Sequence, residues 1–498
     1  MASKDLIGLG LAFMGIAGGV ILTCISTRAR DLFFLAMIWL APMTEHYDIN
    51  FVSRDFYRGT ARGFEFSLVD ILSISLLLSA LLIPRRGTSR GYWPASLGLM
   101  ILFFLYACFN VGIADPKLFG LFELFKMVRG MTIFLAVAFY LRSERELRML
   151  ILGLGLVVCY EGTLALRQRY FWGLHRVPGT LDDSNSLSAF LCTTAPFFVA
   201  AITSRLPRLL KALSALAIAV ACVGVVLTIS RAGVIIIALV LLGTAIGTVS
   251  VRFTPRKVLI TLLIVIAATG VTLKSWKTLQ TRFDSSSFKD EYTNKKTLGR
   301  GYYIRVAAAI AEDRWFGVGL NNWSYWVSQK YGPKLGYRFV PYRGTDREPS
   351  LDVPPGSNVD EAQAAPAHSL AALTAGELGL PGLVLFSVLW LRWFQMGASF
   401  LWPRIPDPMR RMGIGIFFGL CGIFLQSLTE WVFRHSPIYY TVHILLGALA
   451  ALYYVKRQEK RAAKAPKLEC EESLSPHYST IPEEPAPVAN MGFRPCSV

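Results

Sequence analysis

The sequence predicts an all-α polytopic membrane protein, and its composition and the spacing of its apolar residues support this prediction. Of its 498 residues 53% are hydrophobic and only 17% are charged, and the mean hydropathy is +0.46. The apolar residues gather in runs near the roughly 20 residues that a helix needs to cross a bilayer. A soluble chain of this length would be expected to have a more polar composition and several domains.

About 12–13 transmembrane helices follow from this length rule. The runs lie approximately at 6–26, 31–42, 67–83, 94–113, 118–141, 148–166, 185–203, 209–229, 232–250, 257–273, 369–400, 411–429 and 437–455. The second run is short, and the run from 369 is expected to begin as an interfacial helix that turns at Pro381. No clear cleavage site follows the first run, so we expect a retained helix rather than a removed signal peptide.

Clusters of lysine and arginine between the runs predict the orientation, because such clusters stay on the cytoplasmic side. The clusters are Arg85/Arg86/Arg90, Arg142/Arg145/Arg148, Arg205/Arg208/Lys211, Arg252/Arg256/Lys257, Arg404/Arg410/Arg411 and Lys456/Arg457/Lys460/Arg461/Lys464. An even number of runs separates each cluster from the next, so all of them can be cytoplasmic together. The net charge of +18 therefore indicates topology rather than a nucleic-acid partner.

Four regions follow from this topology. We expect transmembrane helices 1 to about 10 in 1–273, a large outer loop in 274–367, C-terminal transmembrane helices in 368–455 and a disordered cytoplasmic tail in 456–498. The loop should contain a helix around 302–312. Its aromatic residues predict a folded cap that binds a flat, polyhydroxylated ligand such as a sugar, or alternatively an interfacial anchor. These aromatic residues are Trp315, Trp323, Tyr325, Trp326, Tyr331, Tyr337 and Tyr342.

Three charged residues recur every third position in the run 118–141. Glu123, Lys126 and Arg129 should lie near one face of the helix. Charges within a membrane span are costly and usually face the interior of the bundle or a wet cavity. The alternative is a structural Glu123–Lys126 pair, which would leave Arg129 in need of another partner.

Arg231 stands between two apolar runs in Ser230-Arg231-Ala232-Gly233, with no carboxylate nearby in the sequence. A guanidinium suits a phosphate, because its planar fork donates two parallel hydrogen bonds and keeps its charge. Further cations are expected on the same outer side at Arg176 (with Asn185), Arg305 and Arg434. Together these residues could hold a diphosphate.

His368 lies where the long polar loop meets the run from 369. A single histidine at this position is compatible with helix capping or packing, and also with a catalytic base. The sequence has no Gly-x-Ser-x-Gly nucleophile motif, no Cys-x-x-Cys pair and no closely spaced histidines. We therefore expect no metal and no cofactor, with arginines neutralising the charge of a leaving group.

These motifs resemble those of the O-antigen ligase/O-antigen polymerase family of bacterial membrane glycosyltransferases. The resemblance rests on Arg231 in its Ser-Arg-Ala-Gly context, on Arg305 ahead of 312–320, and on His368-Ser369 followed by Gly379 and Gly382. Ser369 replaces a commoner asparagine, and the acidic, proline-rich tail is not a family feature.

The resemblance implies a GT-C-type transmembrane fold in the bacterial inner membrane, with its active site on the periplasmic side. It implies inverting, metal-independent transfer of a glycan from undecaprenyl diphosphate to a hydroxyl of lipid A core or a similar acceptor. His368 would be the general base and Arg231, Arg305 and Arg176 would bind the donor diphosphate. Lys126, Arg129, Asn185 and Arg434 are further candidates for donor binding.

Two alternatives remain open at this point. A polysaccharide polymerase would use the same donor and the same chemistry to extend lipid-linked repeats. A small-anion transporter, for example for bicarbonate, would instead line its pathway with Arg231 and the Glu123/Lys126/Arg129 face. Expected partners of the enzyme are the lipid-linked glycan, the acceptor and membrane lipids, with no nucleic acid.

Overall fold

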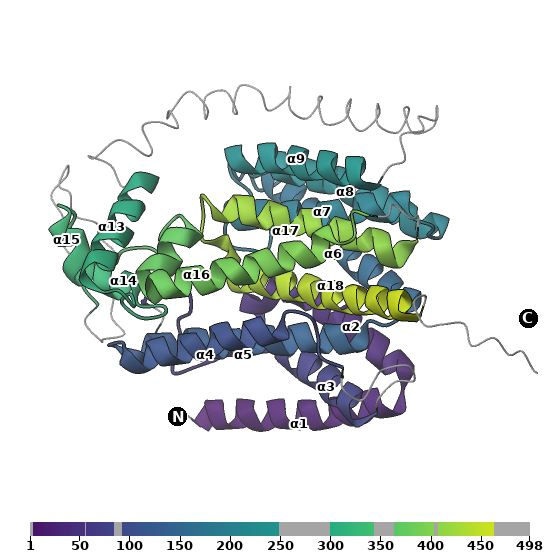
Figure 1. The fold of residues 1–498 in the computed structure, drawn as a ribbon, viewed down its shortest axis with the longest axis horizontal. Helices are drawn as coiled ribbons and strands as arrows, with labels where there is room; N and C mark the ends of the chain where they lie inside the picture. Colours follow the sequence, from purple (N-terminus) through teal and green to yellow (C-terminus); the bar gives the residue numbers. More distant parts are fainter. Residues whose placement is uncertain are drawn as a thin grey trace, which may run out of the picture. The chain divides into compact units, whose positions relative to one another are not determined.

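A computed structural model describes residues 3–54, 56–83, 92–248, 299–342, 363–402 and 407–462, and these residues are mainly helical (Figure 1). Eight of the described helices are long and apolar enough to cross a membrane, and α3 and α4 are shorter apolar helices. The protein is therefore an all-α polytopic membrane protein, as predicted. The predicted run 257–273 and the tail beyond residue 462 lie outside the described residues.

Twelve of the described helices follow the predicted runs. They are α1 (Ser3–Ile25), α2 (Thr27–Leu40), α3 (Leu68–Leu82), α4 (Leu97–Ile113), α5 (Lys117–Tyr140), α6 (Glu144–Tyr170), α7 (Ser184–Thr203), α8 (Arg208–Leu227), α9 (Arg231–Thr248), α16 (Leu370–Ala398), α17 (Pro408–Ser427) and α18 (Ser436–Ala462). Several begin where the sequence provides a cap. Ser67 with Asp70 and Ser143 with Glu146 form capping boxes at α3 and α6, which satisfy backbone N–H groups at each helix start.

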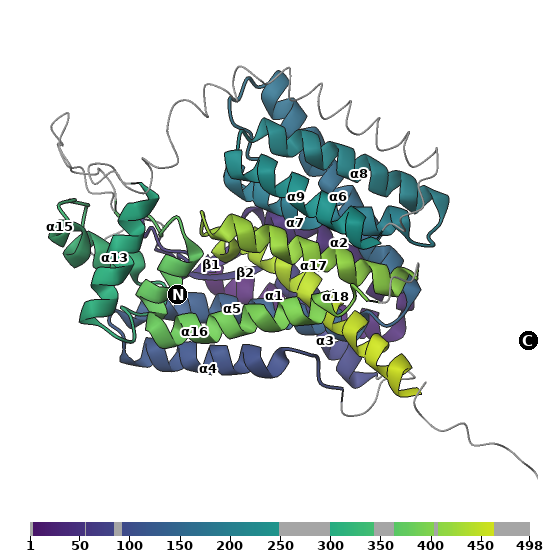
Figure 2. The ribbon, with the colours of Figure 1, turned by 45° about the horizontal axis from the view of Figure 1, so that its top comes forward.

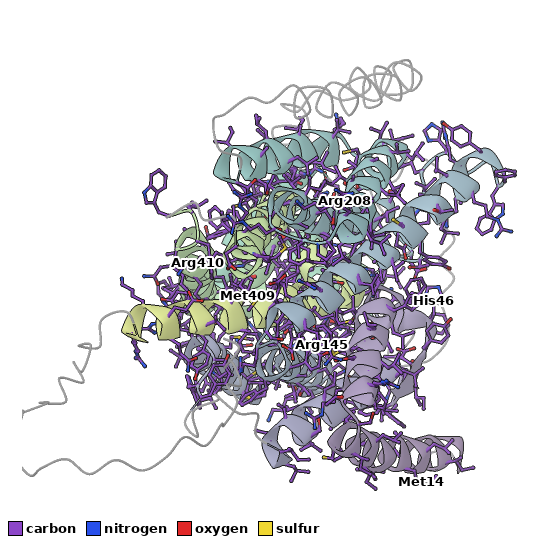
Figure 3. The ribbon with its side chains drawn as sticks, turned by 90° about the vertical axis from the view of Figure 1, so that its right-hand side faces the viewer. Met14, His46, Arg145, Arg208, Met409 and Arg410 are labelled. Carbon is purple, nitrogen blue, oxygen red and sulfur yellow. The ribbon has the colours of Figure 1, made fainter. Side chains whose placement is uncertain are left out.

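The described basic clusters gather at one end of the bundle. Figure 3 looks onto this end, where Arg145, Arg208 and Arg410 are labelled. Segments 171–183 and 428–435 and the cap helices lie at the other end (Figures 1 and 2). The described basic clusters therefore lie together at one end of the bundle, as the sequence predicted.

Close helix packing in the core depends on small residues in α17. A side chain at Gly419 would overlap the backbone carbonyl of Thr193 in α7, and one at Gly422 would lie 2.9 Å from the Cys192 carbonyl oxygen. The two backbones therefore approach each other closely, as small residues allow in membrane bundles. The same core continues into α18, where Leu445, among others, is fully buried.

The end of the bundle opposite the basic clusters, called the outer end below as a name only, contains a short β-hairpin that the sequence did not predict. β1 (Asp48–Phe51) pairs antiparallel with β2 (Phe64–Ser67), with Asp48 opposite Ser67. The tip of this hairpin is joined to the cap by Asn321. The Asn321 amide accepts a hydrogen bond from Thr60 N (2.7 Å) and donates to Ala61 O (2.8 Å).

The described part of the large loop forms a small helical cap. It consists of α13 (Arg300–Asp313), α14 (Trp323–Trp326), the π-helical turn η2 (Val327–Tyr331) and α15 (Gly332–Lys334). The helix predicted around 302–312 is thus confirmed by α13. Trp323, Tyr331 and Tyr337 are buried in the hydrophobic core of the cap, so they cannot present a face to a sugar, whereas Trp315 is 59% exposed.

The predicted turn at Pro381 is wrong, because α16 breaks at Gly379 instead. Gly379 has φ +70° and ψ −177°, which essentially only glycine adopts. Pro381 lies just after the break, where its missing N–H does no harm. The break lets the cap pair with α16: Gly319 N donates to Glu377 O (2.9 Å) and Leu380 N to Trp315 O (3.3 Å).

Replacing Gly379 by alanine should therefore destabilise the protein by roughly 1–3 kcal/mol or more, because the backbone conformation is strained and the new methyl group meets the Trp315 carbonyl. The measurement is thermal unfolding of the detergent-solubilised protein. Gly112→Ala in α4 is the matched control, since no atom lies within 4 Å of its added Cβ. Equal unfolding midpoints for G379A and G112A would contradict the strain argument.

Candidate functional site

His368 and Glu430 form a close pair at the outer end of the bundle. The His368 Nδ1 atom lies 2.5 Å from Glu430 Oε2, and the Tyr303 ring packs against the imidazole with a centroid distance of 5.4 Å. His368 directly precedes Ser369, which caps α16 by accepting a hydrogen bond from Ala372 N (3.4 Å). With Nδ1 directed at the carboxylate, Nε2 is the nitrogen left to face a ligand. The His368 side chain is 39% exposed, so a ligand can reach it.

Glu430 joins His368 to residues from two other elements. Its Oε1 accepts hydrogen bonds from Asn185 Nδ2 (3.2 Å) and Arg300 Nη2 (3.4 Å). Arg300 also donates through Nε to Thr429 O (3.1 Å), which fixes the chain just before Glu430. The carboxylate is buried, and these contacts compensate for its removal from water.

Arg176 extends this cluster toward the start of α9. Its Nη2 donates to Asn185 Oδ1 (3.1 Å) and its Nε to Thr228 O (3.4 Å). Thr228 precedes Arg231, the half-buried first residue of α9, by three positions. A chain of hydrogen bonds therefore runs from Arg176 through Asn185 and Glu430 to His368, and Arg231 begins the helix beside it.

The loop that carries Arg176 is anchored to α6 by buried polar residues. The Glu161 carboxylate accepts hydrogen bonds from the Thr180 backbone N (3.0 Å) and from the Thr180 hydroxyl. The Gln168 amide donates to Gly179 O and accepts from Gly179 N, both at 2.8 Å. The position of Arg176 is thus set by the anchoring of its loop to α6 as well as by its own hydrogen bonds.

Arg305 lies on α13, the same short helix that contributes Arg300 and Tyr303. The contacts of the described residues join Arg300 and Tyr303, but not the Arg305 guanidinium, to the Glu430–His368 pair. Arg305 is half-buried at this end of the molecule. The structure thus brings His368, Arg176 and Asn185 into one cluster, while Arg231 and Arg305 flank it on their helices.

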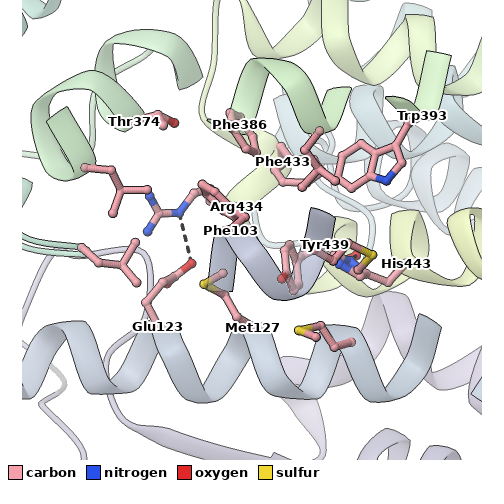
Figure 4. Close-up of a pocket in the computed structure, with 15 residues that line it drawn as sticks. Phe103, Glu123, Met127, Thr374, Phe386, Trp393, Phe433, Arg434, Tyr439 and His443 are labelled. Atoms are coloured by element: carbon pink, nitrogen blue, oxygen red, sulfur yellow. Dashed lines mark hydrogen bonds and ion pairs between the residues drawn. The ribbon is translucent and has the colours of Figure 1, made fainter. Parts of the chain in front are cut away.

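A second cluster surrounds Arg434, which is buried a few residues beyond Glu430. Arg434 Nε lies 3.1 Å from Glu123 Oε1, and Nη1 lies 2.6 Å from Glu377 Oε2. Lys126 Nζ contacts Glu123 Oε2 (2.8 Å) and donates to Arg434 O (2.8 Å). The predicted Glu123–Lys126 pair is therefore confirmed, and Lys126 and Arg434 hold the chain after Glu430. Figure 4 shows Arg434 and Glu123 at the edge of a mainly apolar pocket lined by Met127, Phe386 and Phe433.

Arg129 points into the bundle and has the partner that the sequence left unidentified. Its Nε donates to the Asp70 carboxylate (2.9 Å), its Nη1 lies 3.4 Å from Glu65 Oε2, and it stacks on the Tyr440 ring at 4.9 Å. These contacts tie the hairpin and α3 to α5. In this structure Arg129 is engaged by protein groups rather than turned toward His368.

Sequence inspection missed Glu430, the group closest to His368. The only local signal was an acidic residue at the end of the apolar run 411–429. Its significance depends on contacts with residues 62 and 245 positions away, which no local pattern reveals. Glu161 and Asp70 were missed for the same reason.

This architecture defines a multi-pass membrane protein with a histidine–carboxylate pair and arginines at one end of its helical bundle. The model of the O-antigen ligase family matches residues 214–387, which extend from α8 into α16 and include Arg231, Arg305 and His368. Residues 214–387 are therefore similar to the domain of the O-antigen ligase family. A search of the curated proteins finds no match to the chain.

Replacing Arg434 by alanine should lower the free energy of unfolding by about 3–5 kcal/mol, because it leaves the buried carboxylates of Glu123 and Glu377 without their common partner. Unfolding midpoints of the purified variants are the measurement. Arg148→Ala is the control: it removes an exposed pair with Glu144 and should change stability by less than about 0.5 kcal/mol. Similar midpoints for both variants would show that the Arg434 cluster is not structural.

Proposed function

We propose that this protein is a glycosyltransferase that moves a glycan from undecaprenyl diphosphate to an acceptor hydroxyl, in the manner of an O-antigen ligase. The observation that carries the proposal is the His368–Glu430 pair, hydrogen-bonded through Asn185 to Arg176. A base beside guanidinium groups is the arrangement that such a transfer needs. The site lies at the end opposite the basic clusters, which favours the periplasmic face of the inner membrane.

In the proposed reaction neutral His368 accepts the proton of the acceptor hydroxyl at Nε2. The hydroxyl oxygen attacks the anomeric carbon, and the bond from this carbon to the diphosphate oxygen breaks with its electron pair on the diphosphate. Attack from the side opposite the leaving group inverts the anomeric configuration. Glu430 holds the imidazole in orientation through Nδ1 and stabilises the imidazolium that forms, the role of the carboxylate in a catalytic triad.

The arginines are assigned to the diphosphate. Arg176, Arg231 and Arg305 would neutralise the charge that builds on the leaving group, and this would make metal-independent chemistry possible. Lys126, Arg129 and Arg434 are instead engaged in buried ion pairs, so we assign them a supporting role.

The acceptor distinguishes the two enzyme candidates. A ligase would transfer the glycan to lipid A core or a similar acceptor, whereas a polymerase would transfer it to another lipid-linked repeat. The matching model is that of the O-antigen ligase family, which favours the ligase. The match does not identify the acceptor. A small-anion transporter is less favoured, because the charges on the Glu123/Lys126/Arg129 face are occupied by protein partners.

The proposal predicts that the purified protein transfers glycan from undecaprenyl diphosphate to lipid A core in the presence of EDTA. The products are separated by gel electrophoresis, where transfer to the core and a ladder of longer lipid-linked glycans are distinct. A ladder would establish the polymerase alternative. Activity that EDTA abolishes and Mg²⁺ restores would overturn the metal-independent mechanism.

His368→Ala should lower kcat by about 10²–10⁴-fold, the usual contribution of a general base. Glu430→Gln keeps the shape of the side chain but loses the charge that stabilises the imidazolium, so its kcat should also fall, by a smaller factor. Ser369→Ala, which removes only the cap of α16, is the matched control for local structure. Full activity of a folded His368→Ala protein would exclude the proposed base.

Replacing Arg176, Arg231 or Arg305 by glutamine should raise KM for the lipid-linked donor by about tenfold or more, because each loses a charge-assisted contact with the diphosphate. The KM for the acceptor should stay the same. Lys330→Gln is the control, since it removes a cation of the cap that pairs with Asp313 at the surface. Unchanged donor KM in all three arginine variants would remove these residues from the donor site.

A further inference from the structure

The end of the bundle opposite His368 contains a guanidinium with unpaired hydrogen-bond donors. Arg142 follows α5, and its Nη1 donates to Leu141 O (3.3 Å). Its Nε and Nη2 atoms are shielded from solvent and have no hydrogen-bond partner among the described residues. The acidic residue nearest in sequence, Glu144, pairs with Arg148, and Glu146 accepts from Ser143 N through its Oε2. Within the described part of the chain, the edge of Arg142 formed by Nε and Nη2 thus has no acceptor.

Aromatic rings hold this guanidinium in place. The Arg142 Cζ atom lies 4.0 Å from the centroid of the Tyr92 ring, 5.3 Å from that of Tyr454 and 6.0 Å from that of Phe139. Contacts of this kind use the ring faces and stabilise the charge, but they do not satisfy N–H groups in the guanidinium plane. The rings therefore fix the orientation of the fork without occupying its donors.

The Tyr92 hydroxyl is a third donor at the same place. It is buried, and it makes no well-directed hydrogen bond among the described residues, although the Arg142 guanidinium lies close enough to oppose the rise of its pKa. Burial raises the pKa of Tyr92, so the hydroxyl keeps its proton. A buried donor without an acceptor costs free energy, and more so when the donor is charged. Three such donors close together indicate that an acceptor is missing.

The geometry points to a phosphate-binding site formed by Arg142 and Tyr92, which we propose binds the phosphate of an anionic membrane lipid. The Nε–H and Nη2–H bonds of arginine are parallel and match two oxygens of a phosphate, and the Tyr92 hydroxyl can donate to a third oxygen. A carboxylate offers only two oxygens for these three donors. Arg142 as a whole is only half-buried, so the site lies close to the surface of the bundle.

The surroundings of Arg142 fit an anionic lipid. Lys456 and Arg457 follow Tyr454 within one turn of α18, and Arg145 lies at the same end of the bundle (Figure 3). The Lys456 Nζ atom lies 4.8 Å from the centroid of the Phe400 ring. Basic groups beside the ends of membrane helices attract lipid phosphates. This site is far along the helices from His368 and is independent of the proposed transfer reaction.

The test uses the full-length protein in detergent, titrated with phosphatidylglycerol, phosphatidylcholine or inorganic phosphate. Native mass spectrometry counts the bound lipid, and thermal unfolding reports stabilisation. We expect the wild-type protein to bind phosphatidylglycerol and Arg142→Gln to bind it about tenfold or more weakly, the loss of a charge-assisted pair. Arg148→Gln, at the same end of the bundle, should bind as the wild type does.

Tyr92→Phe keeps the charge and the ring but removes one donor, so it tests the site even if Arg142→Gln does not fold. It should weaken binding less than Arg142→Gln. Protection of the wild type by inorganic phosphate as well, lost in Arg142→Gln, would identify free phosphate as the source of the same ligand chemistry. Equal phosphatidylglycerol binding by the wild type, Arg142→Gln and Tyr92→Phe would overturn the proposal.

Discussion

Charges buried inside a membrane-spanning bundle need partners, and this requirement shapes the outer half of the protein. Arg434 meets two carboxylates from different helices, and Arg129 meets Asp70 from a third. These ion pairs tie α3, α5 and α16 to the segment after α17. That segment carries Glu430, and it is held on one side by Arg300 at Thr429 and on the other by Arg434. The geometry of His368 thus depends on charges that do not touch it.

The candidate site is assembled from distant parts of the chain. His368 and Arg300 lie within the matched residues 214–387, but Glu430, Asn185 and Arg176 lie outside them. Residues 214–387 alone would therefore lack the carboxylate that orients the histidine. The family match shows what residues 214–387 are similar to, while the arrangement of the site becomes visible only in the folded chain.

Hydropathy and charge were sufficient to predict the described apolar helices and the gathering of basic residues at one end of the bundle, because both follow from the cost of placing polar groups in lipid. The Glu123–Lys126 pair was also accessible, since residues three apart share a helix face. The hairpin 48–67 could not be predicted, because its strands have four residues each and lack a clear alternation of apolar and polar residues. The break in α16 was assigned to Pro381, although the conformation required there belongs to Gly379. Glu430 could not be found because its partners are distant in sequence.

Asn321 has a mechanical consequence for the cap. Its side chain and backbone bond to the hairpin tip and to Phe119 at the start of α5, all in buried surroundings. On the other side, backbone hydrogen bonds join 318–319 to α16. A cap fastened on both sides cannot lift away as a hinged lid unless these bonds break together. The described part of the cap should therefore stay in place over this end of the bundle. We expect substrates to reach the site laterally, between helices and through the plane of the bilayer, rather than through the cap.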